Sequence, residues 1–183
     1  MIGNHHVLAI IPARGRSRRF PRKNVREFLG TPLVARAIEQ AQSCRYVDRV
    51  ICSTEDPEVN RIARACGCEV QPRPWVLASD QATMNEVLRH ILGANSGYDL
   101  ALVLQPTSPL RSILDVEMGI SLGMSISVGP SGAPNGAVYV VETARFKCYP
   151  YFGGQVFYMP AERSIDIDTE ADWKKAEEYG RQG

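Results

Sequence analysis

The chain has 183 residues, of which 44% are hydrophobic and 22% charged, and its 21 Lys and Arg against 20 Asp and Glu leave a net charge of +1. This size and composition predict a single globular domain over residues 1–183 with a core of its own. The sequence holds no apolar run of about 18 residues and no secretory signal, so we expect a cytoplasmic protein that does not enter a membrane. The five cysteines lack zinc-ligand spacing.

Apolar runs alternate with helix-period segments along the chain, which is typical of an α/β fold with a mostly parallel sheet. The predicted strands are 7–11, 49–53, 69–71, 100–104, 125–128, 136–141 and 156–159. The predicted helices are 33–42, 58–65, 85–92, 114–122 and 171–179. Asp56 before Pro57, and Thr169 with Asp172 three residues later, are residue types that cap helix amino termini. We therefore expect a central sheet of about seven strands flanked by helices.

The loop after the first predicted strand carries the densest charge in the sequence. Its cationic residues, counted to the end of the cluster, are Arg14, Arg16, Arg18, Arg19, Arg22, Lys23 and Arg26. In an open α/β sheet, a loop at the carboxyl end of a strand commonly binds phosphate, and this density indicates a polyanionic ligand. Gly15 and Ser17 leave room for backbone N–H groups to face phosphate oxygens. The alternative is a solvated basic loop on the surface.

Two classes of protein are less consistent with this loop, the Walker A nucleotide hydrolases and the nucleic-acid-binding proteins. The Walker A pattern is absent, which disfavours an ATPase or GTPase of that kind. The basic residues elsewhere are balanced by acidic ones, and no aromatic and basic residues interleave outside the loop, which disfavours nucleic acid. The sequence therefore favours a nucleoside triphosphate.

A second polar motif, QPTSPLR at residues 105–111, follows the apolar run 100–104. Its two prolines fix the backbone of a turn and remove two donors. The Gln105 amide and the Thr107 and Ser108 hydroxyls then project from a rigid frame, which suits a hydroxylated ligand. The alternative is a strand-to-helix turn in which the hydroxyls act as caps.

The third motif is SIDIDT at residues 164–169. Side chains two residues apart in an extended segment share a face, so Asp166 and Asp168 are expected to point together while the isoleucines point into the core. Adjacent carboxylates repel one another, and a divalent cation such as Mg²⁺ that also binds phosphate oxygens relieves this repulsion. The alternative is that Asp168 caps the last helix and Asp166 pairs with an arginine such as Arg163.

A triphosphate, a polyol and Mg²⁺ at one sheet edge predict nucleotidyl transfer, in which an acceptor oxygen attacks the α-phosphorus and pyrophosphate leaves. Positioning and charge neutralisation would supply most of the catalysis. The residues expected to carry this chemistry are Arg14, Arg18, Lys23, Asp166 and Asp168.

Five segments resemble the N-acylneuraminate cytidylyltransferases, also called CMP-sialic acid synthetases. They are LAIIPARG at 8–15 with Ser17, PRKN at 21–24, LQPTSPLR at 104–111, PNGAVY at 134–139 and SIDIDT at 164–169. The 3-deoxy-manno-octulosonate cytidylyltransferases share the type of opening motif but lack the sequences LQPTSPLR and SIDIDT. The resemblance implies a Rossmann-like nucleotidyltransferase fold that transfers CMP from CTP to the anomeric hydroxyl of a 2-keto sugar acid.

The resemblance also implies roles for individual residues. Those on the implied CTP-binding loop are Ala13, Arg14, Gly15, Ser17, Arg18, Lys23 and Asn24, and those implied to recognise cytosine and ribose are Arg73, Ala78, Ser79 and Asp80. The implied sugar-pocket residues are Gln105, Thr107, Ser108, Asn135, Tyr139 and Phe152. Asp166 and Asp168 fall on the family's metal-binding pair, with Mg²⁺ as the implied cofactor.

Three departures from the family pattern bear on activity. Arg16-Ser17-Arg18-Arg19 stands where the family usually has G-S-K-G or N-S-K-G, so Arg18 replaces a lysine and Arg19 a glycine, and neither exchange is neutral. Ala133 stands where relatives commonly carry arginine. The relatives also place an additional dimerisation segment before the PNGA strand. We therefore expect a monomer or a different dimer, and three functions stay open: an active enzyme, a binding homologue with impaired transfer, or a transferase with another base preference.

Overall fold

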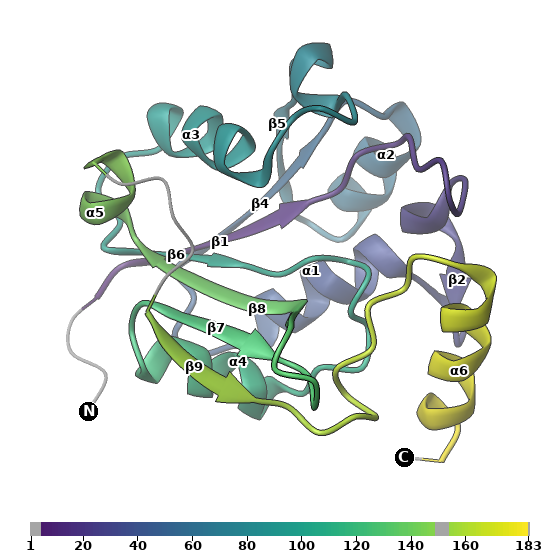
Figure 1. Ribbon diagram of the computed structural model, residues 1–183. Coiled ribbons are helices and arrows are strands. Elements are labelled where there is room, and N and C mark those ends of the chain that lie inside the picture. Colours follow the sequence, from purple (N-terminus) through teal and green to yellow (C-terminus); the bar gives the residue numbers. More distant parts are fainter. Residues whose placement is uncertain (1–4, 149–153, 183) are drawn as a thin grey trace.

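A seven-stranded sheet forms the centre of the chain in the computed structural model, which describes residues 5–148 and 154–182 (Figure 1). The strands are β1 (Val7–Pro12), β4 (Arg49–Thr54), β5 (Glu69–Pro72), β6 (Leu100–Val103), β7 (Ser125–Val128), β8 (Pro134–Glu142) and β9 (Gln155–Tyr158). They lie in the order β5-β4-β1-β6-β8-β7-β9. Only β8 runs antiparallel to its neighbours in this sheet. The predicted strands and the mostly parallel sheet are confirmed.

Six helices accompany the sheet in the described part of the chain. They are α1 (Leu33–Ser43), α2 (Pro57–Ala65), α3 (Met84–Ala94), α4 (Ile113–Ser121), α5 (Thr143–Cys148) and α6 (Glu170–Gly180). The Asp56 side chain accepts from two backbone N–H groups of α2, and Thr169 forms a capping box with Asp172 at the start of α6, as predicted. None of these helices has the length and apolar character needed to cross a bilayer.

Several short elements were not predicted. They are α5, the hairpin strands β2 (Glu27–Phe28) and β3 (Thr31–Pro32), and 3₁₀ turns at Lys23–Val25 and Trp75–Ala78. Each is too short to show a period in the sequence. The hairpin turns through Leu29 and Gly30, which both have positive φ.

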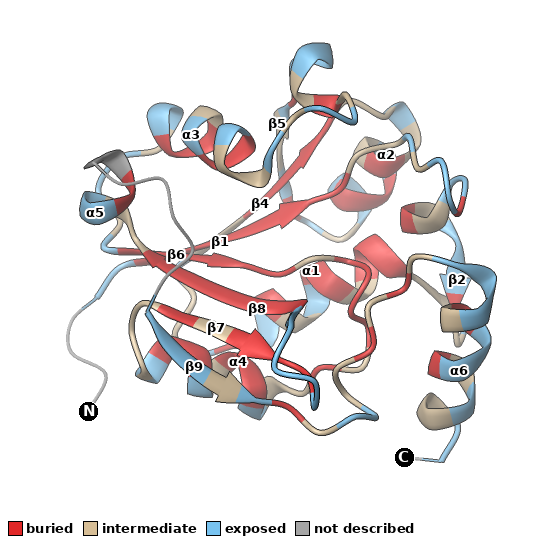
Figure 2. Cartoon of the chain, in the orientation of Figure 1, coloured by how far each residue is buried: buried red, intermediate tan, exposed pale blue. Residues whose placement is uncertain are grey.

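The central strands are buried along most of their length (Figure 2). Their alternate side chains enter two cores, one on each face of the sheet. In β1, Val7, Ala9 and Ile11 face the core formed with α1, α2 and α4, while Leu8 and Ile10 face the core formed with α3 and α5. Strands buried on both faces read as continuous apolar runs, which is why β1 was recognisable from the sequence. A third and smaller core lies beneath α6.

A short turn joins β7 to β8, at the place where the family resemblance implies an additional segment. The Gly129 N–H donates to the Ala133 carbonyl at 3.0 Å, and the Gly132 N–H donates to the Gly129 carbonyl at 2.9 Å. The two strands then pair directly as an antiparallel hairpin. The inserted segment is therefore absent from this connection.

Candidate functional site

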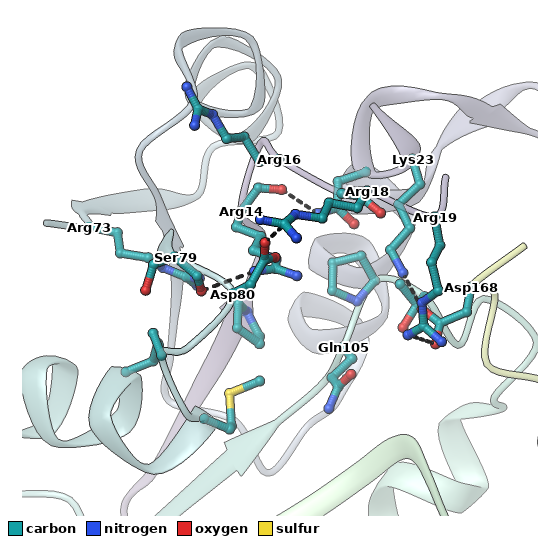
Figure 3. Close-up of a pocket in the computed structure, with 18 of the residues that line it drawn as sticks. Arg14, Arg16, Arg18, Arg19, Lys23, Arg73, Ser79, Asp80, Gln105 and Asp168 are labelled. Atoms are coloured by element: carbon teal, nitrogen blue, oxygen red, sulfur yellow. Dashed lines mark hydrogen bonds and ion pairs between the residues drawn. The ribbon is translucent and has the colours of Figure 1, made fainter. Parts of the chain in front are cut away.

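The order of the parallel strands determines where the candidate site lies. The chain builds β4 and β5 on one side of β1, then crosses to place β6 on the other side. In sheets of this kind, ligands bind where the direction of building reverses, outside the carboxyl ends of the two strands concerned. A pocket of about 570 Å³ opens there, between the loops that follow β1 and β6 (Figure 3).

Twelve of the residues predicted from the sequence line this pocket. They are Arg14, Ser17, Arg18, Lys23, Asn24, Arg73, Ser79, Asp80, Gln105, Thr107, Asp166 and Asp168. They come from three motifs and from the 73–80 segment, which are far apart in sequence. The three polar motifs therefore converge at one sheet edge.

Asp80 neutralises two cations at one end of the pocket. The Arg18 Nε lies 2.6 Å from Asp80 Oδ2, and the Arg14 Nη1 lies 3.1 Å from Asp80 Oδ1. Arg14 also donates to the Ser79 carbonyl at 3.1 Å. The Arg18 side chain is 83% exposed, so this pairing is open to solvent.

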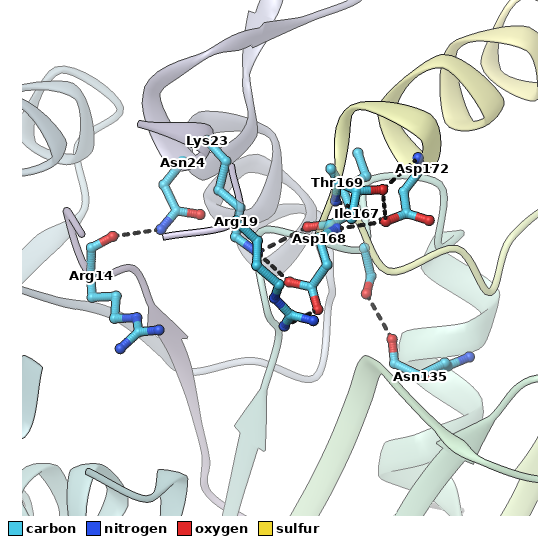
Figure 4. Close-up of polar contacts among 10 residues, drawn as sticks. Arg14, Arg19, Lys23, Asn24, Asn135, Ile167, Asp168, Thr169 and Asp172 are labelled. Carbon is cyan, nitrogen blue, oxygen red and sulfur yellow. Dashed lines mark hydrogen bonds and ion pairs between the residues drawn. The ribbon is translucent and has the colours of Figure 1, made fainter. Parts of the chain in front are cut away.

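Asp168 has the same role at the other end of the pocket (Figure 4). The Lys23 Nζ donates to Asp168 Oδ1 at 2.8 Å and to the Ile167 carbonyl at 2.9 Å, and the Arg19 guanidinium pairs with Asp168 Oδ2. Only 13% of the Lys23 side chain is exposed. This cation is therefore held in one place by two acceptors before any ligand binds.

Asp166 is the least solvated carboxylate on the pocket wall. Its Oδ1 is buried and has no hydrogen-bond partner of ordinary geometry among the described residues. Burial raises the pKa of Asp166, an effect that the nearby Thr107 opposes and the Asp168 charge increases. An orphaned carboxylate oxygen beside a second carboxylate is a donor set that suits a hard divalent cation.

The two alternative roles considered for these aspartates are not seen. Arg163 pairs with Asp115 at 3.0 Å rather than with Asp166. Thr169, not Asp168, caps α6 through its side chain. The side chains of Ile165 and Ile167 are buried, as predicted for an extended segment with its acidic residues on the other face.

Gly15 packs the cationic loop against the residues that precede α2. Its N–H, which we expected to face phosphate oxygens, donates to Glu55 Oε1 at 2.7 Å. A Cβ at this position would lie 2.3 Å from Asp56 Oδ2, so only glycine fits against the start of α2.

The neighbouring Arg73 is buried and donates to the Ser53 carbonyl at 3.0 Å. Burial lowers the pKa of Arg73, and the Glu55 charge opposes that change.

The loop after β6 is clamped by a buried arginine. Arg111 donates through Nη1 to the carbonyls of Gln105 at 2.9 Å and Ala137 at 2.8 Å, and through Nε to the Gln40 side chain at 2.9 Å. Burial lowers the pKa of Arg111 to about 9, against the opposing charges of acidic neighbours. These contacts hold the Gln105 backbone so that its side chain projects into the pocket.

Other predicted residues lie off the pocket wall: Ala13, Gly15, Ala78, Ser108, Asn135 and Tyr139. Ser108 is buried and its hydroxyl donates to the Asn135 carbonyl at 3.0 Å. The Asn135 Oδ1 accepts from the Ser127 hydroxyl at 2.6 Å, and the Tyr139 hydroxyl accepts from the Gly136 N–H at 3.0 Å. These groups brace the 134–139 strand beside Gln105. Phe152 lies outside the described residues.

The pocket also contains residues that were not predicted to line it: Pro12, Arg16, Arg19, Leu77, Ala82, Met84, Val87 and Pro106. The arginines belong to the basic loop, so their charge was the available signal. Leu77, Met84 and Val87 form an apolar part of the wall at the 3₁₀ turn and the start of α3. Their spacing in the sequence resembles that of ordinary core residues, which concealed this role.

Comparison with known proteins identifies the family of the chain. The sequence profile of the cytidylyltransferases matches residues 8–117, more than half of the chain. The chain belongs to the cytidylyltransferase family. The match includes the basic loop, the 73–80 segment and the loop after β6, and thus most of the pocket wall.

Among curated relatives of this cytidylyltransferase, the N-acylneuraminate cytidylyltransferase of Escherichia coli O18:K1:H7 is 26% identical over 213 aligned residues, covering 93% of this chain and 51% of the relative. The pseudaminic acid cytidylyltransferase of Campylobacter jejuni subsp. jejuni serotype O:23/36 is 36% identical over 111 residues, covering 56% of this chain and 47% of the relative. The chain thus spans about half the length of the curated relatives it matches.

Among solved structures, that of a CMP:2-keto-3-deoxy-manno-octonic acid synthetase complexed with CTP matches with a TM-score of 0.79 at 17% identity. The match covers 97% of this chain and 99% of the other. At this level of identity, the similarity supports the Rossmann-like nucleotidyltransferase fold and leaves ligand and substrate to the chemistry of the pocket.

Proposed function

We propose that this cytidylyltransferase transfers CMP from CTP to the anomeric hydroxyl of a 2-keto sugar acid and releases pyrophosphate. The observation that carries the proposal is one pocket, at the switch point of the sheet, in which a wall of cations meets the Asp166 and Asp168 pair. A nucleoside triphosphate needs cations along its phosphates, and nucleotidyl transfer needs acidic residues that can hold a divalent metal. The resemblance in sequence supports CTP and a sialic-acid-like acceptor.

The cations are arranged to receive the triphosphate. Arg14 and Arg18 at one end and Lys23 at the other each already face a carboxylate in the pocket, so their charged groups are oriented inward. Phosphate oxygens accept charge-assisted hydrogen bonds from both lysine and arginine. We propose that the triphosphate takes over part of these contacts when it binds.

The aspartate pair would hold the metal. The buried, unpartnered Oδ1 of Asp166 and the adjacent Asp168 supply hard oxygen donors on the pocket wall. Mg²⁺, when bound there, would neutralise charge on the phosphates and on the leaving pyrophosphate. The raised pKa of Asp166 fits a group whose ionised form lacks sufficient solvation until a cation binds.

The sugar acid would bind beside Gln105 and Thr107, which project into the pocket from the clamped loop. In the transfer step, the anomeric oxygen forms a bond to the α-phosphorus as the bond from that phosphorus to the bridging oxygen of pyrophosphate breaks, and the hydroxyl proton passes to solvent or base. Ser108, Asn135 and Tyr139 would act by shaping this wall, because their polar groups bond to one another and to the adjoining strands.

One observation favours the second candidate, a homologue that binds nucleotide but transfers poorly. Arg19, which replaces a glycine of the family pattern, pairs with Asp168 and adds a second cation to a carboxylate that Lys23 already neutralises. Such pairing competes with a metal ion for the same oxygens. The loss of the additional segment between β7 and β8 removes a further part of the relatives' architecture.

A pyrophosphate-release assay separates the two candidates. The chain is incubated with CTP, Mg²⁺ and a panel of 2-keto sugar acids that includes sialic, pseudaminic and 3-deoxy-manno-octulosonic acids, with ATP, GTP and UTP as controls. We expect release with CTP and at least one of the sugar acids. Binding of CTP without release from any acceptor would support the binding homologue, and release with another nucleotide in preference to CTP would refute the base assignment.

A further inference from the structure

Helix α6 packs on the segment that carries the cations through a small core of its own. The buried members of this core are Phe20, Phe28, Leu33, Ile165, Ile167, Trp173 and Ala176. Figure 1 shows α6 beside β2, so residues near the carboxyl end of the chain lie against residues that follow β1. The proposed chemistry uses none of these side chains.

Arg26 lies at the edge of this core, against two of its rings. Its guanidinium carbon is 4.8 Å from the ring centroid of Phe20 and 4.7 Å from that of Trp173. The rings of Phe20 and Trp173 are themselves 5.4 Å apart. The Arg26 guanidinium also pairs with Glu170 in the first turn of α6 at 3.1 Å. Contact with two aromatic faces and a carboxylate holds an arginine more firmly than a surface ion pair alone.

The turn between Phe20 and Arg26 is conformationally costly. Arg22 has φ 58° and ψ 20°, a left-handed conformation that residues other than glycine adopt only when their surroundings impose it. The Arg22 side chain pairs with Glu58 of α2 on one side. On the other side, Phe20 and Arg26 are held by Trp173. Contacts with two different helices therefore maintain this turn.

The same turn places two groups of the pocket. Lys23 follows Arg22 directly and donates to Asp168 Oδ1 and to the Ile167 carbonyl. Asn24 donates to the Arg14 carbonyl at 2.8 Å, which ties the turn to the start of the basic loop. Because α6 begins two residues after Asp168, the helix that holds the turn also follows directly on the carboxylate that Lys23 meets.

We infer that Arg26 and Trp173 are positioning residues, whose stack with Phe20 holds the 20–26 turn so that Lys23 faces the pocket beside Asp168. For the identity of the ligand, this inference rests on the proposed function. The placement of Lys23 is a property of the free protein, and it is measurable without nucleotide.

The first measurement is amide hydrogen exchange on the full chain without nucleotide. Arg26→Met removes the guanidinium and keeps the apolar stem. Arg45→Met is a matched control, because Arg45 stacks on Tyr46 at 4.6 Å and pairs with Glu117 at 3.3 Å without lining the pocket. We expect exchange in peptides covering residues 14–26 to become about threefold faster or more in Arg26→Met and to stay unchanged in Arg45→Met. Unchanged exchange in Arg26→Met would overturn the inference.

The second measurement is calorimetric titration of the same proteins with CTP and Mg²⁺. We expect the affinity of Arg26→Met to fall about fivefold or more, and that of Arg45→Met to stay near the unsubstituted value. Arg26→Lys retains a charge near Glu170 but loses the planar stack, so its CTP affinity should also fall. It replaces Arg26→Met in both measurements if Arg26→Met does not fold.

The two measurements distinguish failure of this inference from failure of the proposed function. Faster exchange in Arg26→Met, with no CTP binding by the unsubstituted chain, would refute the proposed function and support the positioning of Lys23. Equal CTP affinity in the unsubstituted chain and in Arg26→Met would refute the link between the stack and the nucleotide site.

Discussion

The two ends of the pocket pair cations with a carboxylate in the same way but differ in how firmly they hold them. Asp80 pairs with Arg14 and Arg18 at one end, and Asp168 pairs with Lys23 and Arg19 at the other. At the Asp80 end the Arg14 and Arg18 side chains are 37% and 83% exposed, and at the Asp168 end the Lys23 and Arg19 side chains are 13% and 70% exposed. Exposed ion pairs contribute little free energy and are screened by salt. Arg18 can therefore exchange its carboxylate partner for phosphate at low cost, and Lys23 is the most firmly held of the four cations.

The Asp168 end is tied by backbone hydrogen bonds to two other parts of the fold. The Ile167 N–H donates to the Thr107 carbonyl at 2.7 Å, which ties the aspartate segment to the loop after β6. The Asp168 N–H donates to Asp172 of α6, and the Arg26 stack holds the opposite side. We propose a division of labour, in which Lys23 and the aspartates at the Asp168 end are preset and Arg18 at the Asp80 end adapts to the ligand.

The largest effect should come from the preset end. Asp168→Asn removes one of the two proposed metal ligands and the partner of Lys23, so we expect pyrophosphate release to fall about 100-fold or more. The thermal midpoint should stay within about 5 °C, because Asp168 is partly exposed and not in a core. Asp99 lies directly before β6, at the amino ends of the parallel strands and away from the pocket, so Asp99→Asn is the control and should keep full turnover. Unchanged turnover in Asp168→Asn would refute the metal assignment.

A comparison of single cations tests the division of labour itself. We expect Lys23→Met to weaken CTP binding about 10- to 100-fold, because a positioned and poorly solvated cation is lost. Arg18→Met should weaken it only about two- to threefold, by an amount that shrinks as salt is added. Calorimetric titrations at two ionic strengths measure both effects. Losses of equal size and equal salt dependence would show that the two ends do not differ.

The smallest effect concerns the support of the aspartate segment. The Asp115 carboxylate binds Arg163, just before that segment, and caps α4 with Ser112. Burial raises the pKa of Asp115, but the hydrogen bonds from Arg163 and Ser112 outweigh burial and lower it below its ordinary value. A carboxylate whose pKa is lowered by folding adds stability above its unfolded pKa, and this contribution is lost as the pH falls through the folded value.

Asp115→Asn should therefore lower the thermal midpoint at pH 7 by about 2–6 °C. The difference from the unsubstituted chain should shrink as the pH falls below about 4, where the unfolded carboxyl becomes protonated. Differential scanning fluorimetry between pH 3 and pH 8 measures this dependence. A difference that stays constant with pH would show that the charge of Asp115 contributes nothing.

Much of the fold was predictable because its central strands are buried on both faces. Continuous apolar runs marked β1 and β6, and helix periods with capping residues marked α2 and α6. The β2–β3 hairpin and α5 are too short to show such a period. Their positions depend on contacts with elements distant in the sequence, including the small core under α6.

The candidate site likewise has a part that was predictable from the sequence and a part that was not. Residues of the basic loop and of the loop after β6 were predictable, because both loops leave the carboxyl ends of strands that flank the switch point. The partners of the cations were not, since Arg14 and Asp80 meet only through the fold. Asn135 and Tyr139 were expected to face the ligand, but their bonds to neighbouring strands are tertiary contacts that no local pattern reveals.

The assignment of the pocket to CTP is tested by calorimetric titration of the unsubstituted chain with CTP, UTP, ATP and GTP in the presence of Mg²⁺. We expect one CTP bound per chain, with weaker binding of the other three nucleotides and weaker binding of CTP at high salt. Absence of CTP binding at millimolar concentration, or equal affinity for all four nucleotides, would contradict the assignment of this pocket to CTP.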